Sequence, residues 1–271
     1  MAKPLLEVGA IFDGFRIEQC VHQGGMATLW RVSRADITGP MLMKAPKIAE
    51  GGEPAAIVSF EMEQMILPRL SGIHVPRVIA VGDFAVQPYI VMEYLPGSSL
   101  FYRLAELPLP YAEVIDIGVK VAAALDDLHR QHVIHLDVKP SNIMFRPTGE
   151  AVLIDFGLLH HDQLPDLMQE EYRLPFGTAP YMSPEQLLGI RNDRRSDLFA
   201  LGVLLYFFRR RYGHSAKARP CTGCAGGCGA IRFRRADCSL TIRHGCKKLF
   251  CVVWRSNRRS AIQLRRNSHL T

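Results

Sequence analysis

Polar residues suited to one reaction occur in two short stretches of the chain. HLDVKPSN places Asp137, Lys139 and Asn142 close together, and DFG places Asp155 18 residues after Asp137. A carboxylate can orient and deprotonate a hydroxyl, and an ammonium can neutralise charge on a moving phosphoryl group. Amide and carboxylate oxygens are ligands that suit Mg²⁺. The pattern predicts phosphoryl transfer from ATP, with Asn142 and Asp155 as metal ligands.

A second group of residues, earlier in the chain, suits nucleotide binding. Lys44, in MLMK, would pair with the α- and β-phosphates and be oriented by a helix glutamate, for which Glu61 and Glu63 compete. HQGGMAT contains Gly24 and Gly25, whose backbone amides would approach the phosphates from a flexible lid. A glycine pair also suits an ordinary turn. ATP and Mg²⁺ are the expected cofactors.

The elements that must position these residues follow from hydrophobic periodicity. β-rich runs flank the glycine pair, and GPMLMKAPK, RVIAVGDF and PYIVMEYL predict three further strands. Helical spacing predicts an amphipathic helix in AAIVSFEMEQMILPRL and a long helix from Tyr111 to His129. SDLFALGVLLYFF predicts a buried helix with Ser196 as its N-cap. The chain is therefore expected to be α+β, β-rich over residues 1–95 and mainly helical over residues 96–206.

The order of the motifs resembles that of the eukaryotic-type Ser/Thr protein kinases, especially bacterial members with a GGM glycine loop. The resemblance runs from about Phe15 to Tyr206 and includes GTAPYMSPEQ and SDLFALG. It implies a bilobal fold with an N-lobe core at 15–92, a hinge at 93–95 and a C-lobe that is incomplete after residue 206. The implied activity is transfer of the γ-phosphoryl group of ATP to Ser or Thr hydroxyls of protein substrates.

The resemblance assigns further residues to the site. The family's F-x-x-E phase, counted from Phe60, selects Glu63 as the partner of the strand lysine. VMEYL looks like the hinge, with Met92 as gatekeeper and the backbone of Glu93 and Leu95 meeting adenine. By the same resemblance, three side chains would enclose the adenine ring: Leu29, Leu42 and Met144.

The resemblance also implies a column of four packed side chains between the lobes: Leu67, Val81, His135 and Phe156. Asp197 would anchor this column from the last helix. We therefore expect His135 to have a structural role and not to act as a catalytic base.

One departure from the family pattern concerns regulation. Leu136 stands where the family usually has an arginine that pairs with a phosphate on the activation segment. Between Gly157 and Thr178 the chain has no Ser or Thr, only Tyr172. We expect a protein that is not switched by phosphorylation of this segment.

Charge and cysteine content divide the chain into two parts. Residues 1–206 contain 17 Lys and Arg against 25 Asp and Glu, whereas residues 207–271 contain 16 against 1 and six of the seven cysteines. The net charge of +7 is the sum of −8 and +15, so its positive sign comes from the second part alone and does not indicate a specific nucleic-acid partner. No secretory signal or membrane span is expected, so a cytoplasmic protein is the default; the oligomeric state is unknown.

Three interpretations of residues 207–271 compete. The spacing of Cys221, Cys224 and Cys228 fits no standard zinc site. The arginines fit a basic nucleic-acid tail, which the many cysteines do not. We favour a reading-frame shift near Tyr206, because codons read from the third base permit kinase-like strings such as RPFG and, later, RYPTAAQLAF.

A frame shift has two consequences. Residues 207–271 would be an aberrant, disordered, Cys- and Arg-rich tail. The alternative to an active kinase is then a truncated or frameshifted homologue that binds nucleotide weakly or is catalytically silent.

Overall fold

The computed structural model describes residues 6–47, 54–84, 86–171 and 175–209, together with three short strands nearer the C-terminus. The chain divides into two compact units, Met1–Arg210 and Arg211–Thr271.

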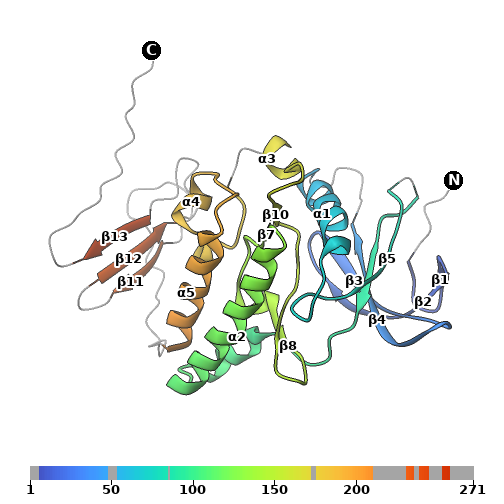
Figure 1. Cartoon of the computed structure of the whole chain (residues 1–271), viewed down its shortest axis with the longest axis horizontal. Coiled ribbons are helices and arrows are strands. Elements are labelled where there is room, and N and C mark those ends of the chain that lie inside the picture. Colours follow the sequence, from blue (N-terminus) through green and yellow to red (C-terminus); the bar gives the residue numbers. More distant parts are fainter. Residues whose placement is uncertain are drawn as a thin grey trace, which may run out of the picture. The chain divides into compact units, whose positions relative to one another are not determined.

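A six-stranded antiparallel sheet forms the first part of the larger unit, in the order β1-β2-β3-β4-β6-β5 (Figure 1). Side chains alternate along β4, so Met41 and Met43 are buried in one small core while Leu42 packs against a second, larger one. Lys44 is in phase with Leu42 and lies on the same face. The strands are β1 (Ile11–Phe12), β2 (Phe15–Gln23), β3 (Ala27–Arg34), β4 (Ile37–Pro46), β5 (Val78–Val81) and β6 (Ile90–Glu93).

Helix α1 (Pro54–Ile66) and the 3₁₀ turn η1 (Leu67–Arg69) accompany this sheet. Phe60, Glu63 and Ile66 recur at three-residue spacing and are all buried, so they form one inward face of α1. Glu61 is exposed. The apolar neighbours on α1 therefore carry a carboxylate into the interior.

Two long helices, α2 (Tyr111–Arg130) and α5 (Arg195–Arg209), dominate the second part of this unit and pack against each other (Figure 1). A Cβ at Gly118 would lie 3.1 Å from the Leu205 side chain, so glycine permits the close approach. The shorter elements are β7 (Val133–Ile134), β8 (Ile143–Phe145), β9 (Ala151–Leu153), β10 (His160–His161), α3 (Leu167–Glu171), α4 (Pro184–Leu187), η2 (Leu100–Glu106), η3 (Pro140–Asn142) and η4 (Ala179–Tyr181).

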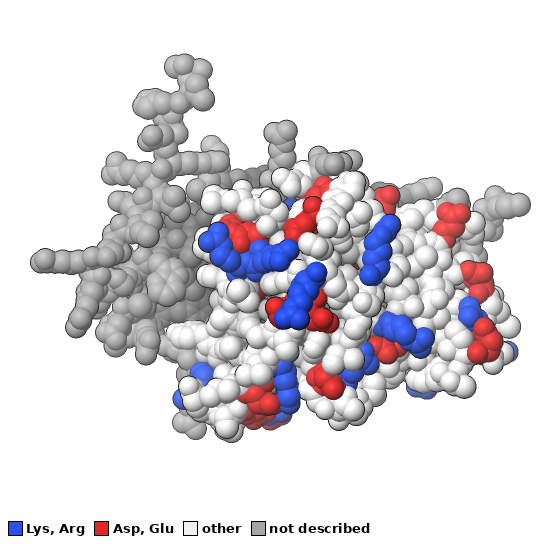
Figure 2. All heavy atoms as spheres, viewed as in Figure 1, with Lys and Arg blue, Asp and Glu red and all other residues white. Residues whose placement is uncertain are grey.

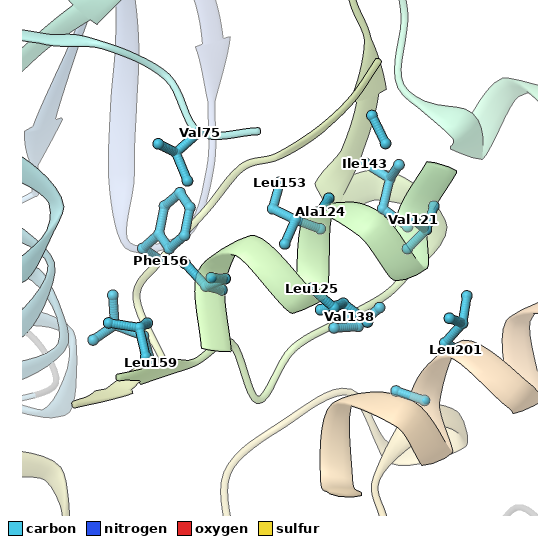
Figure 3. Close-up of a cluster of buried hydrophobic side chains, with 14 of the residues drawn as sticks. Val75, Val121, Ala124, Leu125, Val138, Ile143, Leu153, Phe156, Leu159 and Leu201 are labelled. Carbon is cyan, nitrogen blue, oxygen red and sulfur yellow. The ribbon is translucent and has the colours of Figure 1, made fainter. Parts of the chain in front are cut away.

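The larger core joins the two parts of the unit (Figure 3). Ile66 and Met92 from the sheet side belong to the same cluster of buried residues as Leu125 of α2, Phe156 and Leu204 of α5. The sequence prediction of a small β-rich part followed by a mainly helical part is confirmed.

The start of α5 differs from the prediction. The helix begins at Arg195, so Ser196 lies inside its first turn and the N-cap prediction is wrong. The Asp193 carboxylate accepts from the Arg195 amide at 3.0 Å, while the Ser196 hydroxyl is buried 2.8 Å from that of Ser183. Asp193, two residues before the first residue of the helix, therefore caps the helix, and Ser196 is buried in the core.

The second unit contains a three-stranded antiparallel sheet of β11 (Ala230–Arg234), β12 (Cys238–Arg243) and β13 (Val252–Ser256). These segments are rich in Ile, Phe, Leu and Val, which favour strands. The disorder expected for residues 207–271 as a whole stays a prediction. Cys221, Cys224 and Cys228 lie outside the described residues. In the part of the chain that is described, no helix follows α5.

Candidate active site

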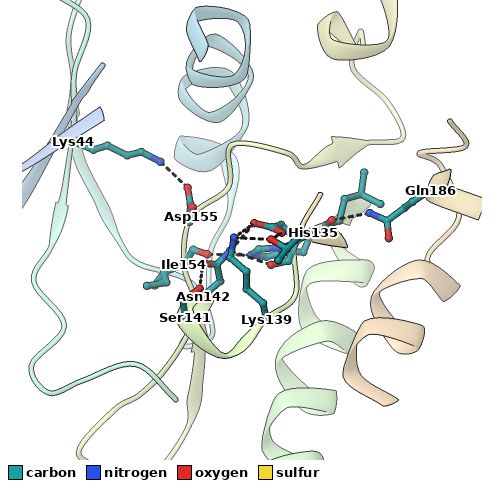
Figure 4. Close-up of polar contacts among 11 residues, drawn as sticks. Lys44, His135, Lys139, Ser141, Asn142, Ile154, Asp155 and Gln186 are labelled. Atoms are coloured by element: carbon teal, nitrogen blue, oxygen red, sulfur yellow. Dashed lines mark hydrogen bonds and ion pairs between the residues drawn. The ribbon is translucent and has the colours of Figure 1, made fainter. Parts of the chain in front are cut away.

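Lys44 stands between two carboxylates. Its ammonium nitrogen lies 2.6 Å from Glu63 Oε2. It also lies 2.9 Å from Asp155 Oδ1, and Figure 4 draws this second contact. Strand β4 supplies the lysine, α1 supplies Glu63, and Asp155 follows β9. The structure therefore brings together three residues that are up to 111 positions apart in the sequence.

Electrostatics fix the charge states of this group. Burial raises the pKa of Glu63, and the nearby Lys44 ammonium opposes that rise. Burial also disfavours the Lys44 charge, but the carboxylates of Glu63 and Asp155 outweigh it and hold the pKa of Lys44 above its ordinary value. The Lys44 charge lowers the pKa of Asp155 to about 2. At neutral pH, Lys44 is therefore a cation and Asp155 an anion.

The loop after β7 holds the second polar group. Asp137 Oδ2 lies 2.6 Å from the Lys139 ammonium, and Asp137 Oδ1 accepts from the Thr178 hydroxyl at 2.7 Å. Lys139 also donates to Thr178 at 2.9 Å. Asn142 donates from its amide nitrogen to both the carbonyl and the carboxylate of Asp137, each at 3.0 Å. The Asp137 carboxylate is thus fixed from three sides.

Asp197, in the first turn of α5, holds the backbone of this loop. The Asp197 carboxylate accepts from the amides of His135 and Leu136 at 2.9 and 2.8 Å. Leu136 has φ of 61°, a left-handed conformation that costs a non-glycine residue about 1–2 kcal/mol. Gln186 donates to its carbonyl at 2.8 Å, so both backbone groups of the strained residue are satisfied. The anchor therefore sets the direction in which Asp137 points.

Hydrogen bonds connect the segment that carries Asp137 and Asn142 with the segment that carries Asp155. The Ile154 amide donates to the Asn142 carbonyl at 3.0 Å, and the Ile154 carbonyl lies 3.2 Å from His135 Nε2. The charge of Lys139 also contributes to the lowered pKa of Asp155. The segment from His135 to Asn142 is therefore hydrogen-bonded to Ile154, the residue before Asp155 (Figure 4).

The residues suit a divalent cation with oxygen ligands. The Asp155 side chain is half-exposed, so its ionised carboxylate can be reached from solvent. The amide nitrogen of Asn142 donates to Asp137, and its amide oxygen accepts from the Ser141 hydroxyl at 3.2 Å. Two hard oxygen donors on adjoining segments are the protein ligands that Mg²⁺ takes beside phosphate oxygens.

The apolar residues assigned to adenine occupy facing strand positions. Leu29 is opposite Lys44 in the β3–β4 pairing, and Leu42 is opposite Met92 in the β4–β6 pairing. Met92 is buried, and Leu29 and Leu42 are partly buried. Met144 lies in β8, two residues after Asn142. The strand register therefore gathers Leu29, Leu42 and Met92 beside Lys44.

The hinge and the glycine turn have defined backbone roles. The Glu93 amide donates to the Arg77 carbonyl at 2.9 Å, and Leu95 follows β6 as a partly buried residue. Gly24 donates to the Ala27 carbonyl at 2.9 Å and closes the turn between β2 and β3, while Gly25 is exposed. The geometry is that of a tight turn, and contact of its amides with phosphate stays a prediction.

The predicted column is present in part. The His135 and Phe156 rings are 5.2 Å apart, and Leu67 belongs to the same buried core as Phe156. Val81 is 46% exposed, so its assignment to the column is wrong. A shift in the β5–β6 register between Val78 and Ala80 changes the phase of β5, and Val78 packs against the core in its place.

Comparison with known sequences agrees with this geometry. Residues 15–215 match the protein kinase domain family. The chain belongs to the protein kinase family. The match starts at the predicted boundary, Phe15, and ends nine residues beyond the predicted end at Tyr206.

Bacterial Ser/Thr kinases are among the relatives of this kinase. It is 34% identical over 193 residues to a probable serine/threonine-protein kinase of Clostridium perfringens, covering 71% of this chain and 28% of the relative. It is 34% identical to the kinase pkn3 of Myxococcus xanthus, covering 71% and 37%. With PknL of Mycobacterium bovis the identity is 30%, covering 74% and 50%. The chain thus spans half or less of the length of these three relatives.

One residue that contacts the predicted hinge was not assigned from the sequence. Arg146, in a loop after β8, donates to the carbonyls of Ile73 and Val75 and to the Glu93 carboxylate. The Glu93 side chain also accepts from the Arg77 amide at 3.2 Å. Arg146 therefore ties the hinge of the kinase to the loop that precedes β5.

Replacing Arg146 with Ala is expected to raise the KM for ATP about tenfold, because hydrogen bonds to charged groups that hold the hinge are lost. The kcat should change less, since Arg146 makes no contact with Asp137 or Asp155 among the described interactions. Steady-state kinetics at fixed Mg²⁺ measures both constants. Arg130→Ala, which removes an exposed arginine on α2, is the control. An unchanged KM in the Arg146 variant would contradict the role in the hinge.

Proposed function

We propose that this kinase transfers the γ-phosphoryl group of ATP to Ser or Thr hydroxyls of protein substrates. The observation that supports this most is the meeting of two groups in one site. Lys44, Glu63 and Asp155 form the group that would hold the phosphates and the metal. Asp137 and Lys139, bridged by Thr178, form the group that would act on the hydroxyl.

The arrangement of these side chains suits the transfer of a phosphoryl group from ATP to a hydroxyl. The oxygen of a substrate hydroxyl forms a bond to the γ-phosphorus, and the bond from that phosphorus to the β–γ bridging oxygen breaks. The hydroxyl proton passes to the carboxylate of Asp137, which is held ready by three hydrogen-bond donors. Lys139 balances negative charge on the transferred group, and ADP is the leaving group. When bound, Mg²⁺ would neutralise the phosphate oxygens; Asn142 and Asp155 would hold it.

The full chain should be incubated with labelled ATP and a generic basic protein, with and without a chelator of Mg²⁺. Transfer that needs Mg²⁺, followed by recovery of phosphoserine or phosphothreonine, supports the proposal. Recovery of phosphotyrosine alone would overturn the Ser/Thr assignment.

Replacing Tyr172 with Phe is expected to leave the rate of transfer unchanged. Residues 135–142, the predicted catalytic loop, have the uncharged Leu136 before Asp137. The segment after Gly157 contains no Ser or Thr before Thr178 that could be phosphorylated. Tyr172 itself lies outside the described residues. Initial rates of the wild type and the variant, measured after preincubation with ATP, test this. A large loss of activity would show that a phosphate on Tyr172 is needed.

The alternative is a truncated or frameshifted homologue, and the exposed apolar side chains of the two long helices favour testing it. Ile115 and Val119 on α2, and Leu198 and Phe199 on α5, are between 38% and 64% exposed. The family match stops at residue 215, where the chain has already changed composition. A truncated or frameshifted homologue that binds nucleotide weakly, or is silent, would have these properties.

Two measurements separate the two functions. A rise in melting temperature with ATP and Mg²⁺, but no phosphoryl transfer, would favour the silent homologue. Sequencing the DNA through codon 206 tests the frame shift directly. An intact frame that encodes the same tail in the purified protein would refute it.

The proposed partner is a protein with accessible Ser or Thr residues. Among the described residues on the face drawn in Figure 2, acidic and basic side chains are interspersed. None of the described helices combines the length and the hydropathy that a membrane span requires.

A further inference from the structure

A buried ionic cluster lies in the segment that connects Gly157 to Thr178. Asp166, immediately before α3, has an 8% exposed side chain, and its Oδ2 accepts from Arg191 Nε at 2.7 Å. The same oxygen lies 2.9 Å from His160 Nδ1. The side chains of Arg191 and His160 are 9% and 12% exposed. One carboxylate therefore gathers two basic side chains from β10 and from the loop after α4.

Arg191 extends this cluster to the segment that follows the metal-binding aspartate. Its second terminal nitrogen donates to the carbonyls of Leu158 and Leu159 at 3.0 and 2.9 Å. These residues come directly after Gly157, whose own carbonyl accepts from the Ser59 hydroxyl of α1. The backbone on the C-terminal side of Asp155 is thus held by one guanidinium and one hydroxyl.

His160 extends the cluster toward the catalytic loop. It pairs with Ile134 in the β10–β7 ladder, and Ile134 immediately precedes His135. The carboxylate of Asp166 is consequently linked, through two basic side chains, to both segments that carry the polar groups of the site.

The cluster depends on the charge of Asp166. Burial disfavours its ionised form, but hydrogen bonds from His160 and Arg191 outweigh burial and hold the pKa of Asp166 below its ordinary value. A buried guanidinium that loses its carboxylate is left with an uncompensated charge, which is strongly unfavourable. Removal of the Asp166 charge should therefore loosen the hold of Arg191 on Leu158 and Leu159.

We propose that Asp166 and Arg191 are positioning residues that hold the backbone after Gly157 and so direct the Asp155 carboxylate toward the metal and nucleotide. The importance of Asp155 rests on the proposed function. The Asp166 carboxylate already pairs with both Arg191 and His160, so the hold on Leu158 and Leu159 is supplied by side chains of the described residues.

The test compares the full-length wild type with Asp166→Asn, which keeps the shape of the side chain and removes its charge. Arg191→Lys is a second variant, because a shorter ammonium cannot reach the carboxylate and both carbonyls in the same geometry. Asp126→Asn, at an exposed ion pair on α2, is the matched control. Hydrogen–deuterium exchange of the peptide covering residues 155–161 is measured first, since it requires no catalysis. The Mg²⁺ concentration that gives half-maximal transfer is measured second.

Both variants at residues 166 and 191 are expected to exchange about tenfold faster across residues 155–161, while Asp126→Asn matches the wild type. Where the wild type transfers phosphate, both should also need several-fold more Mg²⁺, and a purely structural loss of stability would not change that requirement. Unchanged exchange in both variants overturns the inference whatever the activity. Faster exchange in a chain without any transfer would support the positioning role and count against the proposed function alone.

Discussion

An Asp137→Asn variant is expected to transfer phosphate about a thousandfold more slowly than the wild type, because general-base assistance is worth roughly 10²–10⁴ in rate. The amide keeps the shape of the side chain but cannot accept a proton. Its partners Lys139 and Thr178 would still be present, so the fold and the binding of ATP should change little. Single-turnover rates with labelled ATP and ATP titrations followed by melting temperature measure the two effects separately.

Asp116→Asn provides the matched control, since Asp116 is an exposed residue that pairs with Lys120 on α2. It should transfer phosphate at the wild-type rate. A rate for Asp137→Asn within about fivefold of the wild type would be far below the expected general-base contribution and would remove Asp137 from the catalytic role.

Replacing Asp155 with Asn is expected to weaken Mg²⁺-dependent ATP binding by about a hundredfold or more, because a charged oxygen ligand is lost. Transfer should fall with it. Lys44 would retain Glu63 as a partner, so the lobe around α1 should remain folded. Isothermal titration with ATP in the presence and absence of Mg²⁺ tests this, and the loss should appear only when Mg²⁺ is present.

The charge of Asp155 also sets a pH dependence. Because the folded-state pKa is lowered to about 2, the carboxylate remains ionised well below the ordinary range and loses its charge only as pH falls toward 2. In the wild type, Mg²⁺-dependent binding should therefore not weaken through this group between pH 8 and pH 5. Asp155→Glu, which keeps the charge, is the control variant. Equal Mg²⁺ dependence in the Asn variant and the wild type would contradict the metal-binding role.

Much of the fold could be predicted because its elements carry strong periodic signals. The long helix expected from Tyr111 ends one residue later than predicted, at Arg130. Two local predictions were wrong, Ser196 as the N-cap of α5 and Val81 in the column between the lobes. Both depend on neighbouring residues that hydrophobic periodicity does not reveal. Asp193 took the capping position from Ser196, and a shifted strand register turned Val81 toward solvent.

The candidate site was accessible to sequence reasoning where its residues lie in compact motifs. Asp137, Lys139 and Asn142 belong to one loop, and a helical phase distinguishes Glu63 from Glu61. Arg146 and Arg191 gave no such signal, because each acts on partners that only the fold brings near. Arg146 reaches Glu93 across 53 residues, and Arg191 reaches Leu158 across 33. Isolated arginines in loops are common in sequences, so only the three-dimensional structure could identify the partners of these two.

The anchoring of the catalytic loop by Asp197 has a consequence for shortened forms of this protein. Both amides that fix the loop depend on the side chain of Asp197, in the first turn of α5, ten residues before the change of composition at residue 207. A chain cut after Arg209 would keep this attachment and could still present its aspartate correctly. A chain cut before Arg195 would lose it, and the strained leucine next to the aspartate would be free to relax to an ordinary conformation. The smallest fragment worth expressing therefore extends through the end of α5.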